Sequence, residues 1–272
     1  MSPMDFTDAQ LERYARHIIL PEVGGTGQEK LLGTRVLVVG AGGLGAPMLL
    51  YLAAAGVGTL GVVDNDTVDL SNLQRQVIHA TSRIGRPKVE SARDAVADVN
   101  PEVKLIAHKA RLDASNVFEL IRSYDVIADG SDNFGTRFLL NDACHLAGKT
   151  LVSAAILRFE GQISTFKSHL GGDNPCYRCL YRDPPPPGMV PTCAEGGVFG
   201  ALAGVMGSMQ ATEVLKEVLG IGDSLSGHLI IYDALAAMFR KIRLPRDPAC
   251  PLCGDQPSIV DLSAHEAAHA GA

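Results

Sequence analysis

The feature that most constrains the fold is a glycine-rich turn between an apolar run and a helix-forming stretch. The apolar run is RVLVVG at residues 35–40, and Gly40, Gly42 and Gly45 follow in a G-x-G-x-x-G pattern before LGAPMLLYLAAAG. A second apolar run, TLGVVD, closes on Asp64, 19 residues beyond Gly45. Such a βαβ unit presents backbone amides and a helix N-terminus at one point, which favours bound phosphate. The sequence therefore predicts a nucleotide-binding turn, with Asp64 placed to bind ribose hydroxyls.

Alternating strands and helices extend well beyond this unit. Strand-like runs are expected at 103–108, 124–130 and 150–156, and helices at 7–20, 88–99, 114–122, 134–147 and 199–219. After residue 156 the strand-like runs at 159–166, 228–234 and 236–244 have the character of antiparallel strands. We expect an α/β fold: a doubly wound, mostly parallel Rossmann-like sheet with helices on both faces, extended by antiparallel strands. Residues 1–254 are expected to form a single domain, and 255–272 a flexible tail.

Composition excludes several classes of protein. The 272 residues are 46 % hydrophobic, which rules out a disordered chain, and their number rules out a small disulfide-stapled domain. With 24 Lys and Arg against 30 Asp and Glu, the net charge of −6 argues against a nucleic-acid partner. The uncharged run at 196–212 is too short and too rich in glycine for a membrane span, and the N-terminus lacks a signal-peptide pattern. We expect a soluble cytoplasmic protein.

Charged residues follow the strands that flank the glycine turn. The segment 64–76 contains further acids and Arg75, Lys88 comes shortly after, and the strand ending at Asp129 is followed by Asp132. Ligands of open α/β sheets bind at the carboxyl ends of the strands, where these groups would converge. Cations suit a triphosphate, and a carboxylate at that edge can hold Mg²⁺. The combination favours ATP with magnesium over NAD, which is the default ligand of the glycine turn alone.

Four of the six cysteines form two C-x-x-C pairs. CYRC and CPLC are separated by 70 residues, and in a reducing compartment this pattern indicates a four-thiolate zinc site rather than disulfides. Cys144 lies in a helical pattern and is expected to be a buried apolar side chain. The zinc ligands would be Cys176, Cys179, Cys250 and Cys253.

A proline-rich segment precedes the remaining cysteine. Five of the eleven residues at 182–192 are proline, so no regular element is expected there. Cys193 follows directly. It is a candidate nucleophile or an inert loop residue, and the sequence leaves both open.

These segments together resemble a known family. GAGGLG, VDNDTVDLSNLQRQ, GRPKVESA, DGSDN, EGQISTF, CYRCL, TCAEGGV and CPLCG are similar to motifs of the MoeB/ThiF family, bacterial relatives of ubiquitin-activating enzymes. The resemblance runs from about residue 7 to 254 and is strongest for the MoeB branch. It implies ATP-dependent adenylation of the C-terminal glycine carboxylate of a ubiquitin-like sulfur carrier ending in Gly-Gly, of the MoaD or ThiS type. The products are an acyl-adenylate and pyrophosphate. The pathway stays open between molybdopterin, thiamine, tRNA thiolation and cysteine synthesis.

The resemblance also implies roles for matching residues. Arg16 would reach the ATP of a partner subunit in a homodimer, Asp132 would position Mg²⁺, and the four C-x-x-C cysteines would hold zinc. Cys193 matches a cysteine that forms covalent intermediates in some members and is dispensable in others. The implied catalytic residues are Arg16, Arg75, Lys88, Asp132 and Cys193. The implied nucleotide-binding residues are Gly40, Gly42, Gly43, Gly45, Asp64, Asp66, Ser71, Asn72, Leu73, Gln74, Arg75, Lys88, Asp132 and Asn133.

Several relatives in this family continue into a rhodanese domain, which we do not expect here. Sulfur transfer would then need a separate donor, such as a cysteine desulfurase or a rhodanese. Two other functions remain to be tested: a non-catalytic scaffold for a ubiquitin-like partner, and an NAD-dependent oxidoreductase.

Overall fold

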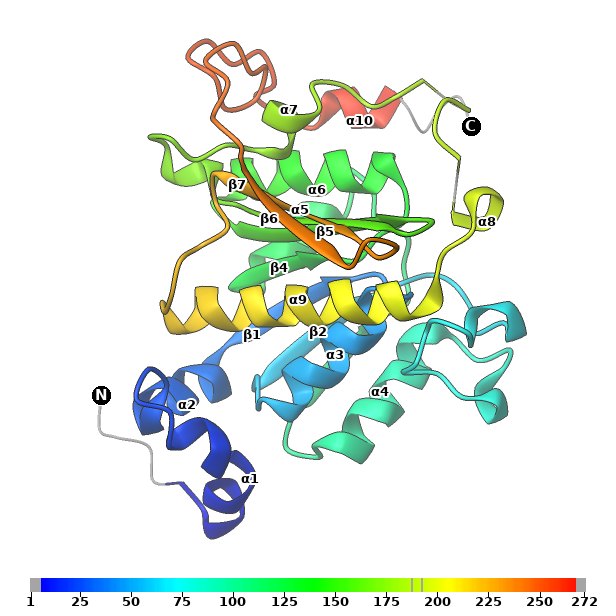
Figure 1. The fold of residues 1–272 in the computed structure, drawn as a ribbon, viewed down its shortest axis with the longest axis vertical. Helices are drawn as coiled ribbons and strands as arrows, with labels where there is room; N and C mark the ends of the chain where they lie inside the picture. Colours follow the sequence, from blue (N-terminus) through cyan, green and yellow to red (C-terminus); the bar gives the residue numbers. More distant parts are fainter. Residues whose placement is uncertain (1–5, 187, 192, 268–272) are drawn as a thin grey trace.

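A computed structural model describes residues 6–186, 188–191 and 193–267 (Figure 1). Its centre is an eight-stranded sheet in the order β3-β2-β1-β4-β5-β6-β7-β8. The first five strands in this order pair in parallel and the remaining pairings are antiparallel, as the sequence predicts. The strands are β1 (Arg35–Val39), β2 (Thr59–Val63), β3 (Lys104–His108), β4 (Val126–Asp129), β5 (Thr150–Leu157), β6 (Glu160–Phe166), β7 (His228–Asp233) and β8 (Met238–Arg243).

Helices cover both faces of the sheet. One hydrophobic core lies beneath α3, α4 and α9 and the other beneath α5 and α6. Because both faces are buried at the centre of the sheet, apolar residues run continuously along β1, β2 and β4 rather than alternating. The helices are α1 (Asp8–Ile18), α2 (Gly24–Gly33), α3 (Gly45–Ala54), α4 (Lys88–Val99), α5 (Val117–Arg122), α6 (Phe134–Ala147), α7 (Tyr177–Leu180), α8 (Cys193–Gly196), α9 (Gly200–Leu219) and α10 (Ser263–Ala267), with short 3₁₀ turns η1 (Leu70–Asn72), η2 (Thr81–Arg83) and η3 (Ser168–Leu170).

The register of the central strands positions the site. Val39 is paired with Val63 on one side and with Asp129 on the other, so three strands end at the same edge. The segments after them, at 40–45, 64–76 and 130–133, therefore leave the sheet side by side. This is the convergence that the sequence predicts.

Most predicted helices form where expected, and their ends have identifiable causes. Thr7 caps α1 through a reciprocal pair of hydrogen bonds with Gln10. Asn133 caps α6, which ends at Gly148 in the left-handed region, with φ of 68°. Helix α2 was not among the predicted elements, because its sequence GGTGQEKLLG has a weak apolar stripe and several glycines.

The C-terminal segment contains a feature that the sequence analysis did not predict. Residues 263–267 form α10, Leu262 is buried in the second core, and His265 Nε2 lies 2.8 Å from Asp142 Oδ2. This part of the expected flexible tail is packed against α6. Residues 268–272 lie outside the described residues.

The proline-rich segment is irregular where the structure describes it, at 182–186 and 188–191. Pro187 and Thr192 lie outside the described residues. In the described part of the chain, no helix is long and apolar enough to cross a membrane.

Candidate active site

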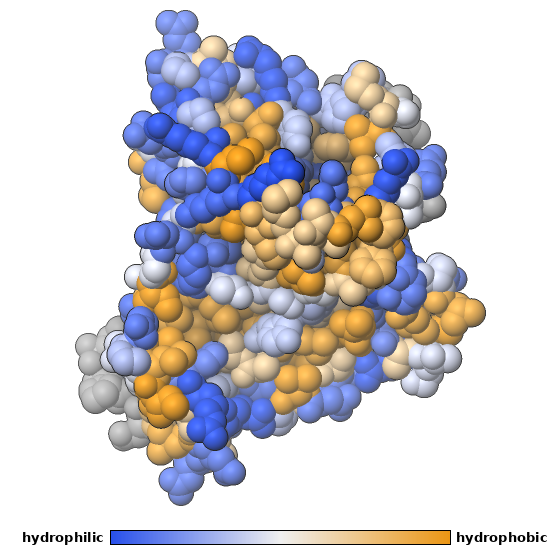
Figure 2. Space-filling view, viewed as in Figure 1, coloured by the Kyte–Doolittle hydropathy of each residue, from blue (hydrophilic) through white to orange (hydrophobic). Residues whose placement is uncertain are grey.

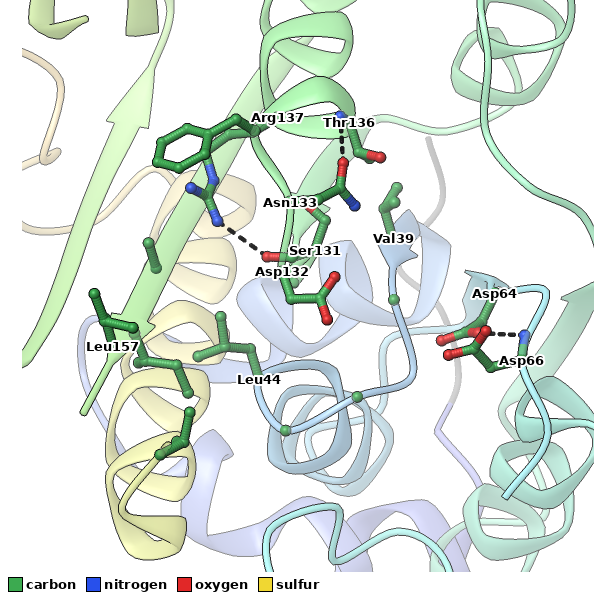
Figure 3. Close-up of a pocket in the computed structure, with 18 of the residues that line it drawn as sticks. Val39, Leu44, Asp64, Asp66, Ser131, Asp132, Asn133, Thr136, Arg137 and Leu157 are labelled. Atoms are coloured by element: carbon green, nitrogen blue, oxygen red, sulfur yellow. Dashed lines mark hydrogen bonds between the residues drawn. The ribbon is translucent and has the colours of Figure 1, made fainter. Parts of the chain in front are cut away.

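A pocket of about 690 Å³ opens at the carboxyl ends of β1, β2 and β4 (Figure 3). Its floor is the glycine turn, where Gly40, Gly42 and Gly43 line the cavity. Gly40 has a φ of 93°, and a Cβ there would lie 2.8 Å from the Gly130 carbonyl oxygen. Only glycine fits this close approach of two loops. The turn therefore brings bare backbone, rather than side chains, to the pocket floor.

Asp64 is held at the end of β2 by two backbone amides. Its Oδ2 accepts from Ala41 N at 2.8 Å, and its Oδ1 accepts from Asp66 N at 2.8 Å. The carboxylate thus links the second strand to the glycine turn. Asp64 lines the pocket, and its role in binding ribose stays a prediction.

Two cations reach the pocket from the chain beyond β2. Lys88 is the first residue of α4; its side chain is 7 % exposed and its Nζ lies 2.9 Å from Asp66 Oδ2. The aliphatic part of Arg75 packs beside Gly43, and its guanidinium donates to the Ser71 carbonyl at 3.2 Å. A buried lysine with an exposed carboxylate partner can exchange that partner for phosphate at little cost.

The segment after β4 forms a further wall of the pocket. Asp132 is exposed, and its carboxylate points into the open space beside Leu44 in Figure 3. Asn133 lines the pocket while its Oδ1 accepts from Thr136 N at 2.8 Å. That bond fixes the start of α6 and therefore the backbone position of Asp132, the residue before Asn133.

A buried ion pair supports this wall. Arg137 donates to the Ser131 carbonyl at 3.0 Å, and its Nε lies 3.6 Å from Asp129 Oδ2. Burial acts to lower the pKa of Arg137, but Asp129, Tyr177 and Asp132 together outweigh it and the pKa is raised. Asp129 also accepts from Ser131 and Ser153. The loop that carries Asp132 is therefore anchored by the bonds that Arg137 and Asp129 make to Ser131.

Some predicted site residues do not line the pocket of a single chain. Gly45 packs beneath the turn against the Gly40 carbonyl, and Arg16 is exposed on α1. The backbone of Cys193 begins α8, and its side chain lies outside the described structure. The surface segment around η1 carries the other four, Ser71, Asn72, Leu73 and Gln74. Their contacts with a nucleotide stay predictions.

Other lining residues were missed by the sequence analysis. Gln76 lines the pocket and is 4 % exposed, and its Oε1 has no hydrogen-bond partner among the described residues. Arg111 and Leu112 follow β3, whose carboxyl end lies beside that of β2. Their place directly after a strand of the parallel sheet could have identified them as pocket residues. The rest of the lining, which we call the second branch, comes from β5, β6, the residue after α7 and the proline-rich segment, and includes Ala155, Leu157, Gly161, Gln162, Tyr181 and Val190.

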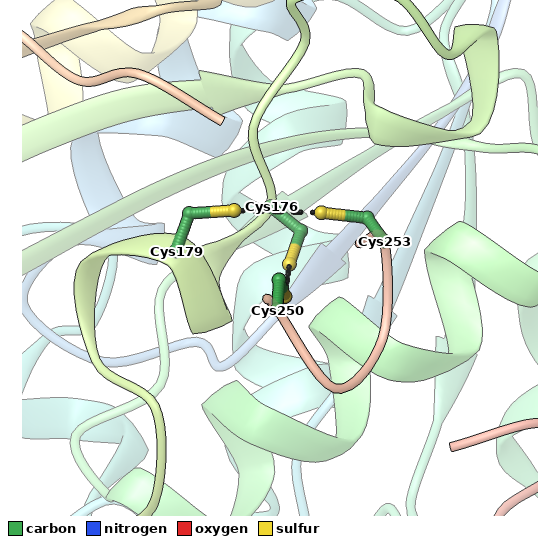
Figure 4. A group of neighbouring side chains, drawn as sticks. All are labelled: Cys176, Cys179, Cys250 and Cys253. Atoms are coloured by element: carbon green, nitrogen blue, oxygen red, sulfur yellow. Dashed lines mark hydrogen bonds between the residues drawn. The ribbon is translucent and has the colours of Figure 1, made fainter. Parts of the chain in front are cut away.

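The four paired cysteines meet in one cluster (Figure 4). All four Sγ atoms lie within 4.8 Å of one another; Cys176 and Cys250 are 3.5 Å apart, and Cys179 and Cys253 are 3.4 Å apart. Disulfide sulfurs would be about 2.0 Å apart. A tetrahedral zinc with Zn–S bonds of about 2.3 Å needs sulfurs roughly 3.8 Å apart. The cluster therefore fits zinc, and it joins the α7 segment to the loop at 250–253.

The helical Cys144 behaves as predicted. It is buried in the second core, and burial raises the pKa of its thiol well above the usual value. A thiol with a raised pKa is a poor nucleophile.

Comparisons with known proteins agree with this architecture. A relative from Thermus thermophilus, a sulfur carrier protein adenylyltransferase, is 52 % identical over 97 % of this chain and 98 % of its own length. The probable adenylyltransferase/sulfurtransferase MoeZ of Mycobacterium tuberculosis is 53 % identical over 89 % of this chain, which spans 62 % of that relative. MOCS3 of Bos taurus, an adenylyltransferase and sulfurtransferase, is 50 % identical over 94 % of this chain, which spans 56 % of it.

A solved structure shares the fold at low identity. The crystal structure of E. coli MccB with ATP superposes with a TM-score of 0.77 at 20 % identity, covering 91 % of this chain and 75 % of that one. Residues 14–252 match the model of the ThiF family. The chain belongs to the ThiF family.

Proposed function

We propose that this protein uses ATP to adenylate the C-terminal carboxylate of a small sulfur-carrier protein. The observation that carries the proposal is the continuity of the pocket. One cavity is lined both by the glycine turn with Lys88 and Asp132 and by the strands β5 and β6. The part lined by the glycine turn, Lys88 and Asp132, which we call the first branch, suits a nucleotide. The second branch leaves room for an extended chain end beside it. The T. thermophilus relative is named for this activity.

The charges around the first branch fit the reaction. A carrier carboxylate is ionised at pH 7, so it attacks the α-phosphate without a general base. The difficulty is repulsion between this anion and the triphosphate. Arg75 and Lys88 would offset that repulsion and stabilise the charge that develops as pyrophosphate leaves. The main work of the site is thus to position two anions against each other.

Asp132 is the side chain best placed to hold magnesium. Its carboxylate is exposed and points into the pocket, and hard oxygen ligands are what Mg²⁺ prefers. Bound there with phosphate oxygens, Mg²⁺ would supply further positive charge to the transferring group. The cysteine cluster would hold zinc in a structural role, because its four thiolates leave no open position.

We further propose that the protein works as a homodimer in which Arg16 completes the partner's site. Arg16 is exposed on α1 and does not line the pocket of its own chain. Figure 2 shows apolar side chains gathered over α9 and the β7–β8 turn, where Val205, Leu235 and Phe239 are exposed. Exposed apolar patches of this kind mark protein interfaces.

Sulfur would come from a separate donor protein, and Cys193 is the residue to test for a covalent link to the carrier. Its position after the proline-rich segment that borders the second branch supports this assignment.

Carrier-dependent exchange of labelled pyrophosphate into ATP tests the proposed function. Purified MoaD-like and ThiS-like carriers are assayed separately, each beside a matched carrier lacking its last glycine. Exchange with an intact carrier alone is expected. Its absence with every carrier, on zinc-loaded protein, would favour a scaffold role, and NADH binding without ATP binding would favour an oxidoreductase.

A further inference from the structure

A buried histidine that does not line the pocket contacts the glycine turn. His79 is 8 % exposed and lies just before η2. Its Nε2 is 2.9 Å from the carbonyl oxygen of Ala41, and its Nδ1 is 2.9 Å from Ser91 Oγ on α4. None of these three residues lines the pocket. His79 therefore joins the interior of the first core to the middle of the nucleotide turn.

The contact with Ala41 determines which nitrogen of the His79 ring carries the proton. A carbonyl oxygen only accepts, so Nε2 must carry the hydrogen, and in the neutral ring Nδ1 accepts from the Ser91 hydroxyl. Burial lowers the pKa of His79, and nearby Lys88 and Arg83 act in the same direction despite the opposing bond to Ala41. The ring is therefore neutral near pH 7, with a single arrangement of its two hydrogen bonds.

The hydrogen bond from His79 to the Ala41 carbonyl also determines the direction of the Gly42 N–H. No peptide bond among the described residues is cis, so the Ala41 C=O and the Gly42 N–H lie in one peptide plane and point in opposite directions. Ala41 is fully buried, whereas Gly42 lines the pocket. Within the described part of the chain, the Gly42 N–H donates to no protein group. An amide without a partner at this point is available to an anion in the pocket.

The peptide bond before Ala41 is also held by a side chain, that of Asp64. The Ala41 N–H donates to Asp64 Oδ2 at 2.8 Å. Both polar backbone groups of Ala41 are thus bound to buried or half-buried side chains, and the residue cannot rotate without breaking one of them. A glycine turn without such contacts would sample other orientations.

We propose that His79 is a positioning residue that orients the Gly42 amide toward the phosphates of the bound nucleotide. The proposal rests on the proposed ATP site and adds to it a residue outside the pocket. It requires no contact between His79 and the ligand. Removing the bond should therefore weaken binding of phosphate groups while leaving binding of the nucleoside unchanged.

The test compares ATP with adenosine by calorimetry on the full-length protein without carrier. His79→Asn is too short to reach Ala41 but keeps a polar group toward Ser91, whereas His79→Gln retains a donor at the position of Nε2. We expect His79→Asn to lose at least about tenfold in ATP affinity, the range of one charge-assisted hydrogen bond. Its affinity for adenosine should change less than about twofold, and His79→Gln should restore most of the ATP affinity.

A second histidine provides the control. His145 on α6 also contacts a serine hydroxyl, Ser168 Oγ, at 2.9 Å, and does not line the pocket. His145→Asn should leave both affinities unchanged. Equal losses for ATP and adenosine in His79→Asn, or no loss, would overturn the proposal.

Two further outcomes are distinguishable. If His79→Asn does not fold, Ser91→Ala, which frees the ring to turn, should show a smaller loss confined to ATP; unchanged binding there would overturn the proposal. Wild-type protein that does not distinguish ATP from adenosine would refute the proposed ATP site itself, and this inference with it.

Discussion

The buried carboxylate of Asp142 offers a quantitative test of how the cysteine cluster is attached to the sheet domain. Asp142, on α6, accepts two hydrogen bonds from Arg178, at 2.8 and 2.7 Å, and a third contact from His265 at 2.8 Å. Arg178 lies in α7, between Cys176 and Cys179. One carboxylate therefore ties together α6, the first cysteine pair and α10. We consider its replacement by asparagine, which keeps the shape and removes the charge.

The expected cost follows from burial. Asp142 is fully buried and the Arg178 side chain is 6 % exposed, so the substitution leaves a buried guanidinium whose remaining acidic partner, Asp183, is exposed and 3.9 Å away. Breaking such a pair from one side costs about 3–5 kcal/mol. Because asparagine retains one acceptor oxygen, we expect Asp142→Asn to lower the free energy of unfolding by about 3 kcal/mol, the lower end of this range. For a chain of this size that is a fall in Tm of roughly 6–10 °C.

The assay is thermal and urea unfolding of zinc-loaded protein, followed by circular dichroism. Asp183→Asn is the matched control, because Asp183 faces the same guanidinium at 3.9 Å but is 76 % exposed. It should change the free energy of unfolding by less than about 0.5 kcal/mol. Asp142→Asn and Asp183→Asn of equal stability would refute the reasoning.

The same pair predicts a pH dependence. Burial acts to raise the pKa of Asp142, but the hydrogen bonds from His265 and Arg178 outweigh it, so the folded-state pKa lies below the ordinary value. The stabilisation is then complete above the unfolded pKa of about 3.9 and is lost as pH falls through the folded value. The stability difference between wild type and Asp142→Asn should be constant from about pH 5 to 7 and shrink below about pH 4.

Three further predictions concern the site and the metal. Lys88→Met should lower kcat/KM for ATP by about 10²-fold, because it removes a buried cation from the first branch of the pocket. Steady-state exchange kinetics measure this value, and an unchanged kcat/KM would remove Lys88 from the mechanism. Cys250→Ser should reduce bound zinc, measured by elemental analysis, and lower Tm, because it removes one of four ligands; retention of one zinc per chain would contradict the assignment. Cys193→Ala should keep pyrophosphate exchange and block formation of the sulfurated product, and unchanged sulfur transfer would make Cys193 a bystander.

The parts of the fold that were predictable are those with a local signal. The run RVLVVG and the glycines after it specify a strand, a turn and a helix without any knowledge of distant residues. Helix α4 begins at Lys88, directly after Pro87, and ends at Val99, where the sequence predicts. The charges that line the pocket were also predictable, because each follows a strand that ends at the same edge.

The parts that were missed depend on contacts between distant segments. Arg137 carries no motif, and Gln76, although it ends the motif at 63–76, has no local signal that marks it as buried in the pocket wall. Their place in the pocket follows from the packing of α6 and the segment after η1. Likewise, nothing local marks His265 as a partner of Asp142, 123 residues away in the sequence. His79 belongs to the same class, because its role depends on a carbonyl 38 residues earlier.

The most direct test of the central claim is the intact mass of a candidate carrier after incubation with this protein, ATP and Mg²⁺, quenched in acid. The account predicts a carrier heavier by one adenylyl group, lost on treatment with hydroxylamine, and no gain on a carrier that lacks its terminal glycine. An unchanged mass for every Gly-Gly carrier, although the protein binds ATP and holds zinc, would contradict it.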